Sequence, residues 1–182
     1  MSKKQIDIRL MTEIGLAVAL VVILDLLKLW RAPQGGSVTL ALVPIMLIAF
    51  RHGLVPGLLA GGLAGVLKLF FGPYVVHPVQ AILDYPLAFM LLGLAGVFCY
   101  HFQNSPNRKP LYLGAGVLVG LLGRFMSHFL AGIVFFGHYA PEGTPVAIYS
   151  LTYNLGFLVP EGLLTFAVLL ALSYHRPLFR IN

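Results

Sequence analysis

Long apolar stretches alternate with short polar ones along the whole chain. Six apolar segments can be delimited, at residues 8–29, 38–50, 54–71, 79–102, 111–136 and 146–174. A helix needs about 20 residues to cross the hydrocarbon core of a bilayer, and most of these segments approach that length. The pattern predicts an all-α integral membrane protein with six transmembrane helices, forming a single membrane domain over residues 1–182.

The second segment, 38–50, is too short for a complete crossing on its own. We expect the stretch 31–37 to complete its outer end and to be buried against protein, because irregular backbone at membrane depth is tolerated only there. This stretch contains Gly35, Gly36 and Ser37. Glycines permit both an ordinary turn and a close approach of backbone to a ligand, and both interpretations remain open.

Composition supports the membrane assignment. Of the 182 residues, 59% are hydrophobic and 10% are charged, and the mean hydropathy is +0.90. A soluble domain carries about 25% charged residues, so a soluble enzyme and a disordered chain are poor interpretations. Lys and Arg outnumber Asp and Glu by 12 to 6. These basic residues lie mainly between the apolar segments, so we expect a lipid bilayer and no nucleic acid as partner.

The distribution of basic residues predicts the orientation. With six crossings, one side of the membrane receives Lys3, Lys4, Arg9, Arg51, Arg108, Lys109, Arg176 and Arg180. Lys28 and Arg31 lie near the first loop on the other side. The excess of Lys and Arg in cytoplasmic loops places both termini in the cytoplasm. The loops at 32–37, 72–78 and 137–145 then face outside.

The sequence has no phosphate-binding loop of the GxxxxGK[ST] type, and Cys99 is its only cysteine. A disulfide framework and a cysteine-based metal site are therefore excluded, and no cofactor is expected. Active transport by this chain would need energy from a partner or from an ion gradient.

Ionisable residues inside a membrane are rare and often functional. This chain has six within or at the ends of its apolar segments: Asp25, Lys68, Asp84, Arg124, His128 and Glu161. Asp84 shares a helix face with Gln80, four residues earlier. It could form a structural ion pair with Lys68 or Arg124, or bind a cationic ligand, and we favour the ligand. For Glu161 we favour a structural or pairing role, and Lys68 is not assigned to a ligand.

A stripe with a spacing of four residues follows the fifth segment: Arg124, His128, Gly132 and Phe136. It is either a helix-packing face, with Gly132 against another helix, or the wall of a ligand site, with Gly132 leaving room for a planar group. We give the two interpretations equal weight.

The sixth segment begins with Tyr149, Tyr153 and Asn154. Tyrosines at that depth are usually interface anchors, an interpretation that suits Tyr153 well. The Asn154 amide needs polar partners in an apolar setting. An acid, an imidazole, an amide and aromatic rings at the outer ends of the last three segments predict a pocket for a small planar heteroaromatic cation.

Several short motifs, in order along nearly the whole chain, carry a family resemblance. They are RLMTEI at 9–14, PQGGSV at 33–38, HPVQ at 77–80 with DY at 84–85, HFLAG at 128–132, FFG at 135–137, AP at 140–141, GTP at 143–145 and YSLTYN at 149–154. The sequence resembles the thiamine-specific substrate-binding components (S components, ThiT or YuaJ type) of energy-coupling factor (ECF) transporters.

The resemblance implies a six-helix membrane protein, without ATPase activity of its own, in the cell membrane of a Gram-positive bacterium. It would bind thiamine near the outer face and dock on a transmembrane coupling protein driven by two cytoplasmic ATPases. The family's pocket residues fall here on Asp84, Tyr85, Tyr74, His128, Gly132, Phe136, Tyr149 and Asn154. Some members carry Trp at the positions of Phe136 and Gly35, so we expect the backbone of Gly35, Gly36 and Ser37 to cover the ligand ring here.

Gly15 and Ala19 lie four residues apart in the first segment. A pair of small residues at this spacing lets another helix approach closely. The partner could be a helix of the same chain, but the family uses a small-residue face here for the coupling protein, which makes docking the favoured role.

Three other functions stay open from the sequence. The chain could be an S component for another vitamin or small heteroaromatic cation. It could be a membrane enzyme using Asp84 and His128 as an acid–base pair, although no nucleophile-elbow or HExxH motif is present. It could also be a homo-oligomeric channel.

Overall fold

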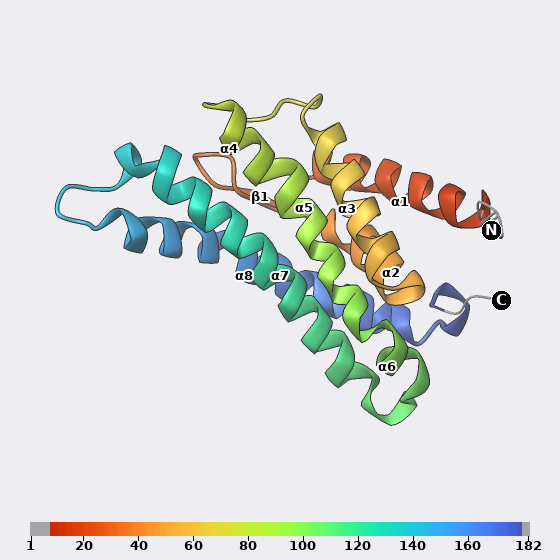
Figure 1. Cartoon of the computed structure of the whole chain (residues 1–182). Coiled ribbons are helices and arrows are strands. Elements are labelled where there is room, and N and C mark those ends of the chain that lie inside the picture. The colour runs from red at the N-terminus through yellow and green to blue at the C-terminus, as the bar shows by residue number, and fades with distance from the viewer. Residues whose placement is uncertain (1–7, 180–182) are drawn as a thin grey trace, which may run out of the picture.

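The computed structural model describes residues 8–179, without the side chain of Arg176, and the fold is helical (Figure 1). These residues form six helical stretches, as the apolar segments predict. Four are single helices: α1 (Ile8–Leu26), α2 (Leu42–His52), α3 (Leu54–Lys68) and α8 (Val146–Ser173). The fifth, α7 (Lys109–Phe135), follows a short 3-10 turn at Pro106–Arg108, and the remaining stretch runs from Pro78 to Asn104. Two further 3-10 turns lie at Gly137–Tyr139 and Arg176–Leu178.

The helix ends differ from the predicted ones where the backbone finds other partners. The first segment was predicted to reach residue 29, but the Leu29 N–H bonds to the Val38 carbonyl at 3.0 Å. This bond extends a two-stranded antiparallel hairpin of β1 (Trp30–Arg31) and β2 (Ser37–Val38), which hydropathy did not predict. α2 therefore begins at Leu42 rather than at residue 38. The end of α3 moves back from residue 71 to Lys68, because the chain tightens there into i→i+3 hydrogen bonds.

The stretch from Pro78 to Asn104 is not a uniform α-helix. α4 (Pro78–Ile82) continues into a π-helical segment at Leu83–Leu87, then α5 (Ala88–Leu91), a 3-10 segment at Leu92–Phe98 and α6 (Cys99–Asn104). Pro86 lies inside the π segment and removes one backbone donor, and the Leu83 carbonyl accepts a hydrogen bond from Ser127 Oγ of α7 at 2.6 Å. π segments of this kind are frequent at functional sites.

α3 crosses this composite helix at backbone contact. A Cβ atom on Gly61 would lie 2.1 Å from the Phe89 carbonyl oxygen, and one on Gly65 would lie 2.4 Å from that of Tyr85. Only glycine allows so close an approach, which fixes the π segment against α3.

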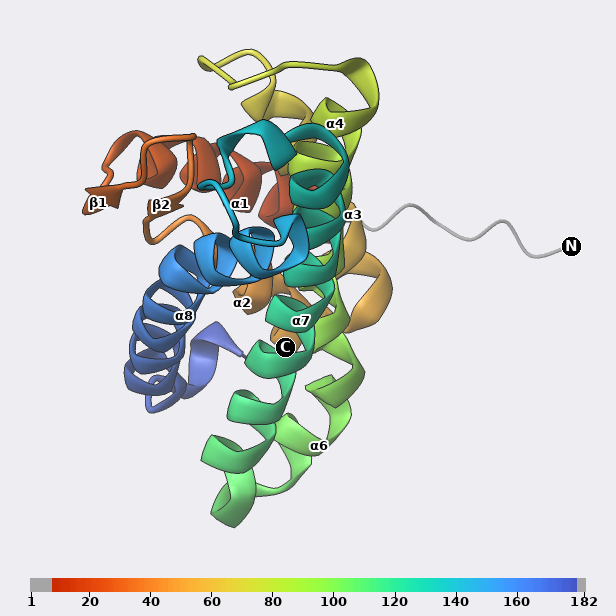
Figure 2. The same cartoon turned by 90° about the vertical axis from the view of Figure 1, so that its left-hand side faces the viewer.

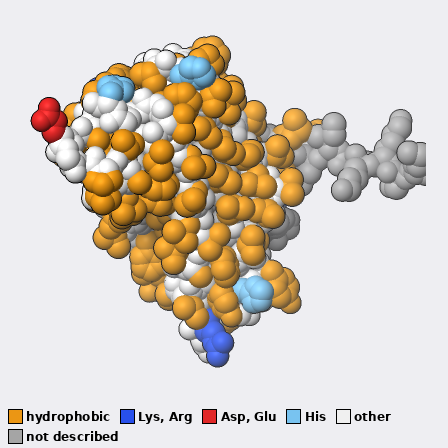
Figure 3. Space-filling model, turned by 60° about the vertical axis from the view of Figure 1, so that its left-hand side comes forward, with side chains coloured by type: hydrophobic (Ala, Val, Ile, Leu, Met, Phe, Trp, Pro, Cys, Tyr) orange, Lys and Arg blue, Asp and Glu red, His pale blue; other side chains and the backbone are white. Residues whose placement is uncertain are grey.

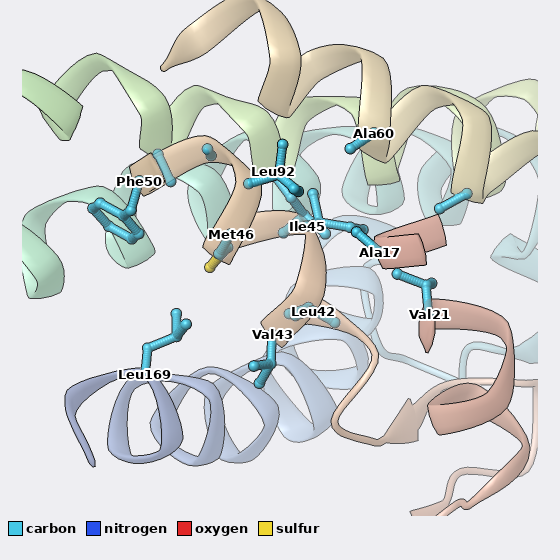
Figure 4. Packing of buried hydrophobic residues seen from close by; sticks show 14 of the residues in the cluster. Ala17, Val21, Leu42, Val43, Ile45, Met46, Phe50, Ala60, Leu92 and Leu169 are labelled. Atoms are coloured by element: carbon cyan, nitrogen blue, oxygen red, sulfur yellow. The ribbon is translucent and has the colours of Figure 1, made fainter. Parts of the chain in front are cut away.

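α2 forms the centre of the hydrophobic core (Figure 4). Before Arg51 and His52 in its last turn it is apolar on all sides, and Leu42, Ile45, Met46 and Phe50 are fully buried. A helix with this pattern belongs inside a bundle. Because protein rather than lipid surrounds α2, it does not need the length of a crossing helix. The predicted burial of 31–37 holds only in part, since Ala32 is buried but Arg31, Pro33 and Gly35 are exposed.

Three stretches of the described residues are long and apolar enough to cross a membrane: Pro78–Asn104, Pro106–Phe135 and Val146–Ser173. Their outward faces carry exposed Leu, Val, Ile and Met side chains. Hydrophobic side chains cover most of the face in Figure 3, with charged and histidine side chains near its ends. This surface fits a protein surrounded by lipid.

The two ends of the bundle have different structures. At one end, the hairpin, α4 and the connection between α7 and α8 gather together (Figure 2). At the other end, Arg51 pairs with Glu13 and donates hydrogen bonds to the carbonyls of Pro177 and Leu178. Lys3, Lys4 and Arg180, which contribute to the predicted orientation, lie outside the described residues.

Candidate ligand-binding site

One cavity lies at the end of the bundle that carries the hairpin. It encloses about 730 Å³ of empty space, which includes a part that is open to solvent. All ten predicted binding residues line it: Gly36, Ser37, Tyr74, Asp84, Tyr85, His128, Gly132, Phe136, Tyr149 and Asn154. They come from the hairpin, the α3–α4 loop, the π segment, α7 and α8. The structure thus brings the predicted set together, and their role in binding stays a prediction.

Asp84 is the acidic group of this cavity. Its Oδ1 lies 2.7 Å from His128 Nδ1, and its Oδ2 accepts a hydrogen bond from Gln80 Nε2 at 2.7 Å. Its side chain is only 14% exposed. A carboxylate has about four lone-pair positions, so each oxygen keeps room for one further donor. Asp84 is therefore a held carboxylate with acceptor capacity left for a ligand.

The hydrogen bonds of His128 fix its tautomer. Arg124 Nε donates to His128 Nε2 at 3.2 Å, and an arginine is always a donor. Nε2 must therefore be the unprotonated nitrogen, and Nδ1 carries the hydrogen that is donated to Asp84. His128 is a neutral imidazole in this arrangement, so it does not neutralise the charge of Asp84.

The two nearby cations are each taken by another carboxylate. Within residues 8–179, Lys68 Nζ pairs with Asp25 of α1, and Arg124 Nη1 pairs with Glu161 Oε2 of α8 at 2.9 Å. The alternative in which Asp84 forms an ion pair with Lys68 or Arg124 is therefore wrong, and Glu161 and Lys68 have the pairing roles considered for them. Both cations also lie near the ring of Phe89, at 4.5 and 4.7 Å from its centroid.

The hairpin forms one wall of the cavity. The Gly36 N–H donates to the Tyr153 hydroxyl at 3.1 Å, and a Cβ on Gly36 would lie 2.6 Å from the ring of Phe157. Gly35 in the turn has a positive φ of 99°. The interpretation of Tyr153 as an interface anchor is wrong, because its hydroxyl holds the hairpin beside the cavity.

Aromatic side chains of Tyr74 and Phe136 also line the cavity. The rings of Tyr74 and Phe136 stack at 6.1 Å, and the Tyr74 hydroxyl lies 2.6 Å from that of Tyr139. This hydrogen bond raises the pKa of Tyr74 above the usual tyrosine value. The Tyr85 hydroxyl accepts from the Tyr74 N–H at 2.7 Å, which ties the α3–α4 loop to the π segment.

Gly132 lines the cavity, but the space beside it is already filled. A Cβ there would lie 2.1 Å from Ser150 Oγ and 3.5 Å from Asn154 Nδ2. Ser150 Oγ donates to the Phe129 carbonyl at 3.0 Å, so α7 and α8 cross at this glycine. Ser150 therefore fills the side-chain position of Gly132, which favours the packing interpretation, while Gly132 still lines the cavity and its role in binding stays a prediction. Asn154, 4% exposed, donates to the Ser150 carbonyl at 2.8 Å.

Sequence reasoning did not place every residue of the cavity wall. The additional residues are Gln34, Gly35, Lys68, Gln80, Phe89, Arg124, Ser150, Tyr153 and Phe157. Gln80 had a usable signal, since it is four residues before Asp84 on one face. Phe89 and Phe157 had none, because hydropathy does not distinguish a ring that faces a cavity from one that faces lipid.

The small-residue face of α1 points away from the bundle. A Cβ on Gly15 would meet no atom of the described residues within 4 Å, and Ala19 is exposed. Leu16, Leu20 and Ile23 beside them are 62%, 48% and 55% exposed. The alternative of packing within the chain is therefore wrong for this face.

Comparison with known proteins identifies the family. The family model described as "Thiamine transporter protein (Thia_YuaJ)" matches residues 11–180. The chain belongs to this family. It is therefore a member of a transporter family rather than an enzyme, and a multi-pass protein of the cell membrane.

Individual relatives agree with this assignment. The thiamine transporter ThiT of Bacillus subtilis is 39% identical over 91% of this chain and 90% of its own length. The thiamine transporter ThiT of Lacticaseibacillus paracasei is 40% identical over 70% of this chain and 68% of its own. The solved structure of ThiT from Listeria monocytogenes matches with a TM-score of 0.87 and 26% identity, covering 94% of this chain and 97% of that one.

Proposed function

We propose that this chain is the thiamine-binding S component of an ECF importer. It binds extracellular thiamine in the cavity around Asp84 and delivers it inward together with a coupling protein and two cytoplasmic ATPases. Thiamine is then the transported ligand, and no catalytic cofactor is involved. The names of the relatives and the chemistry of the cavity both support thiamine as the ligand.

The observation that carries this proposal is the unneutralised carboxylate of Asp84. Its partners His128 and Gln80 are neutral, while Lys68 and Arg124 are paired with other acids. A buried carboxylate without a counter-ion is costly, so the site favours a ligand that brings one positive charge. The thiazolium of thiamine carries such a charge, and aromatic faces suit its two rings.

The test is a titration of the purified chain with thiamine, comparing Asp84→Asn with the parent. Asn keeps the shape of the side chain and removes its charge. Loss of a charge-assisted contact costs about 1.5–3 kcal/mol, so the affinity should fall roughly ten- to over a hundredfold. Glu142→Gln is the matched control, because Glu142 is an exposed acid in the α7–α8 connection and does not line the cavity.

Unchanged thiamine binding by a folded Asp84→Asn variant would contradict the proposed role of Asp84. Titration with other heteroaromatic cations tests the alternative ligand class. If one of these cations binds more tightly than thiamine, the proposed ligand is wrong but the proposed binding site stands.

The proposal places the coupling protein on the α1 face of Gly15 and Ala19. This face is exposed and apolar, and the small residues at its centre allow a partner helix to approach closely. With both termini in the cytoplasm, the cavity opens to the outside, and the opposite end of the bundle, where Arg51 pairs with Glu13, faces the ATPases. The chain supplies binding and its partners supply energy.

Gly15→Trp should separate binding from transport. The large ring would keep a partner helix away from α1, while the cavity, lined by other elements, stays intact. We expect thiamine affinity to be retained and ATP-driven uptake into proteoliposomes with the complete complex to be lost. Gly156→Trp is the matched control, since Gly156 of α8 is also an exposed helical glycine with open space beside it. Normal uptake by Gly15→Trp would show that this face does not dock.

A further inference from the structure

Five charged side chains, each at most 14% exposed, lie at or beside the ligand cavity, and acids outnumber bases among them. Asp25, Asp84 and Glu161 are acids, whereas Lys68 and Arg124 are the only two bases among them. Lys28 approaches Asp25 only to 4.0 Å and its side chain is 33% exposed, so water screens it. Two ion pairs leave one negative charge, and the hydrogen bonds place it on Asp84.

Glu161 neutralises Arg124, whose positive charge would otherwise act on Asp84. Arg124 and Asp84 both contact His128, so the guanidinium lies one imidazole away from the binding carboxylate. The second oxygen of Glu161 accepts from Thr39 Oγ1 at 2.8 Å, and Thr39 Oγ1 accepts from the Ala41 N–H at 3.2 Å. Glu161 and Thr39 are each 1% exposed, so this carboxylate is held firmly in place.

We propose that Glu161 is a positioning and specificity-determining residue for the cavity. It neutralises Arg124 and holds its Nε on His128, which keeps His128 in the neutral Nδ1–H form and leaves the full charge of Asp84 for a cation. Glu161 thereby sets the preference of the site for a positively charged ligand over a neutral one of the same shape. This inference rests on the proposed function and adds the residue that determines charge selectivity.

The experiment compares two ligands across a series of charge variants. The ligands are thiamine and an uncharged isostere in which a thiophene replaces the thiazolium ring, and the measurement is the ratio of their affinities. Glu161→Gln removes one negative charge and makes the cluster neutral. Arg124→Gln removes one positive charge. The double variant Arg124→Met with Glu161→Met removes one charge of each sign, so the net charge of the cluster stays the same.

We expect the preference for thiamine to fall roughly tenfold in Glu161→Gln, to rise in Arg124→Gln, and to stay near the parent value in the double variant. The size follows from one unit charge acting over roughly 10 Å at an effective dielectric constant of about 20. Glu142→Gln also removes one negative charge, but Glu142 is exposed and does not line the cavity, so it is the matched control and should keep the parental ratio.

A purely structural role for Glu161 would weaken both ligands equally. An unchanged ratio in Glu161→Gln would therefore overturn the inference. Failure of the parent chain to bind thiamine would instead refute the proposed function. A parent chain that binds both ligands equally well would overturn the charge selectivity and leave the binding site standing.

A measurement on the unmodified protein gives a second test, independent of how the variants fold. The ¹⁵N NMR signals of His128, assigned by their loss in His128→Gln, should show a neutral ring with an unprotonated Nε2. A protonated imidazolium or the Nε2–H tautomer would overturn the inference.

Discussion

Gly65→Ala tests whether the contact between α3 and the π segment positions the binding carboxylate. The added Cβ would lie 2.4 Å from the Tyr85 carbonyl oxygen and 2.6 Å from Pro86 Cα, whereas an ordinary contact is at least 3.4 Å. Both are backbone atoms, so the π segment has to move by about 1 Å. The 2.7 Å hydrogen bond between Asp84 and His128 would then stretch beyond the hydrogen-bond range.

The matched control is Gly62→Ala on the same helix, where the nearest atoms to an added Cβ, those of Met90, lie at 3.8 Å or more. Both substitutions gain the same helix propensity, so that contribution cancels between them. The difference that remains is overpacking, about 1–3 kcal/mol of stability. We expect Gly65→Ala to melt at a lower temperature than Gly62→Ala and to bind thiamine about ten- to a hundredfold more weakly.

Thermal denaturation and calorimetric titration in detergent measure the two effects. If Gly65→Ala melts and binds like Gly62→Ala, the α3 contact does not position Asp84, and the structural reasoning is refuted.

Two other substitutions test single hydrogen bonds of the cavity. Tyr153→Phe removes the acceptor for the Gly36 N–H and should weaken thiamine binding up to roughly tenfold. The control Tyr174→Phe, at the exposed end of α8, should have no effect. Equal affinities of the two variants in the titration would contradict the role of the hairpin. His128→Ala removes the donor to Asp84 and should lower the affinity by about tenfold, and parental affinity in a folded variant would remove His128 from the site.

The sequence predicted the helices and the location of the cavity for physical reasons. Apolar segments of membrane length have few alternatives to the helix, because every backbone group must be paired inside the segment. Polar groups such as Asp84, His128 and Asn154 stand out against an apolar background, since burial of each is costly. The family resemblance added Tyr74 and Tyr85, which hydropathy alone does not single out.

The details that escaped prediction depend on contacts between distant segments. The π segment at Leu83–Leu87 arises where α3 glycines meet the composite helix, and hydropathy contains no information about that crossing. The packing at Gly132 could not be predicted either, because its neighbour Ser150 belongs to another helix. The partners of Lys68 and Arg124 were likewise decided by the packing of α1 and α8.

The enclosed position of α2 has a consequence for biogenesis. Its 11 residues extend only about 16 Å, roughly half of the hydrocarbon thickness, and include Arg51 and His52. Such a segment does not partition into lipid by itself, so it enters the bilayer together with α3 as one helical hairpin turning at Gly53. α1 packs on one side of it, but other residues that cover it, among them Leu92 and Leu169, are synthesised later. During synthesis part of α2 is therefore uncovered until α8 emerges, and a chain arrested before that point would leave this part of an apolar core helix unprotected for membrane quality control to recognise.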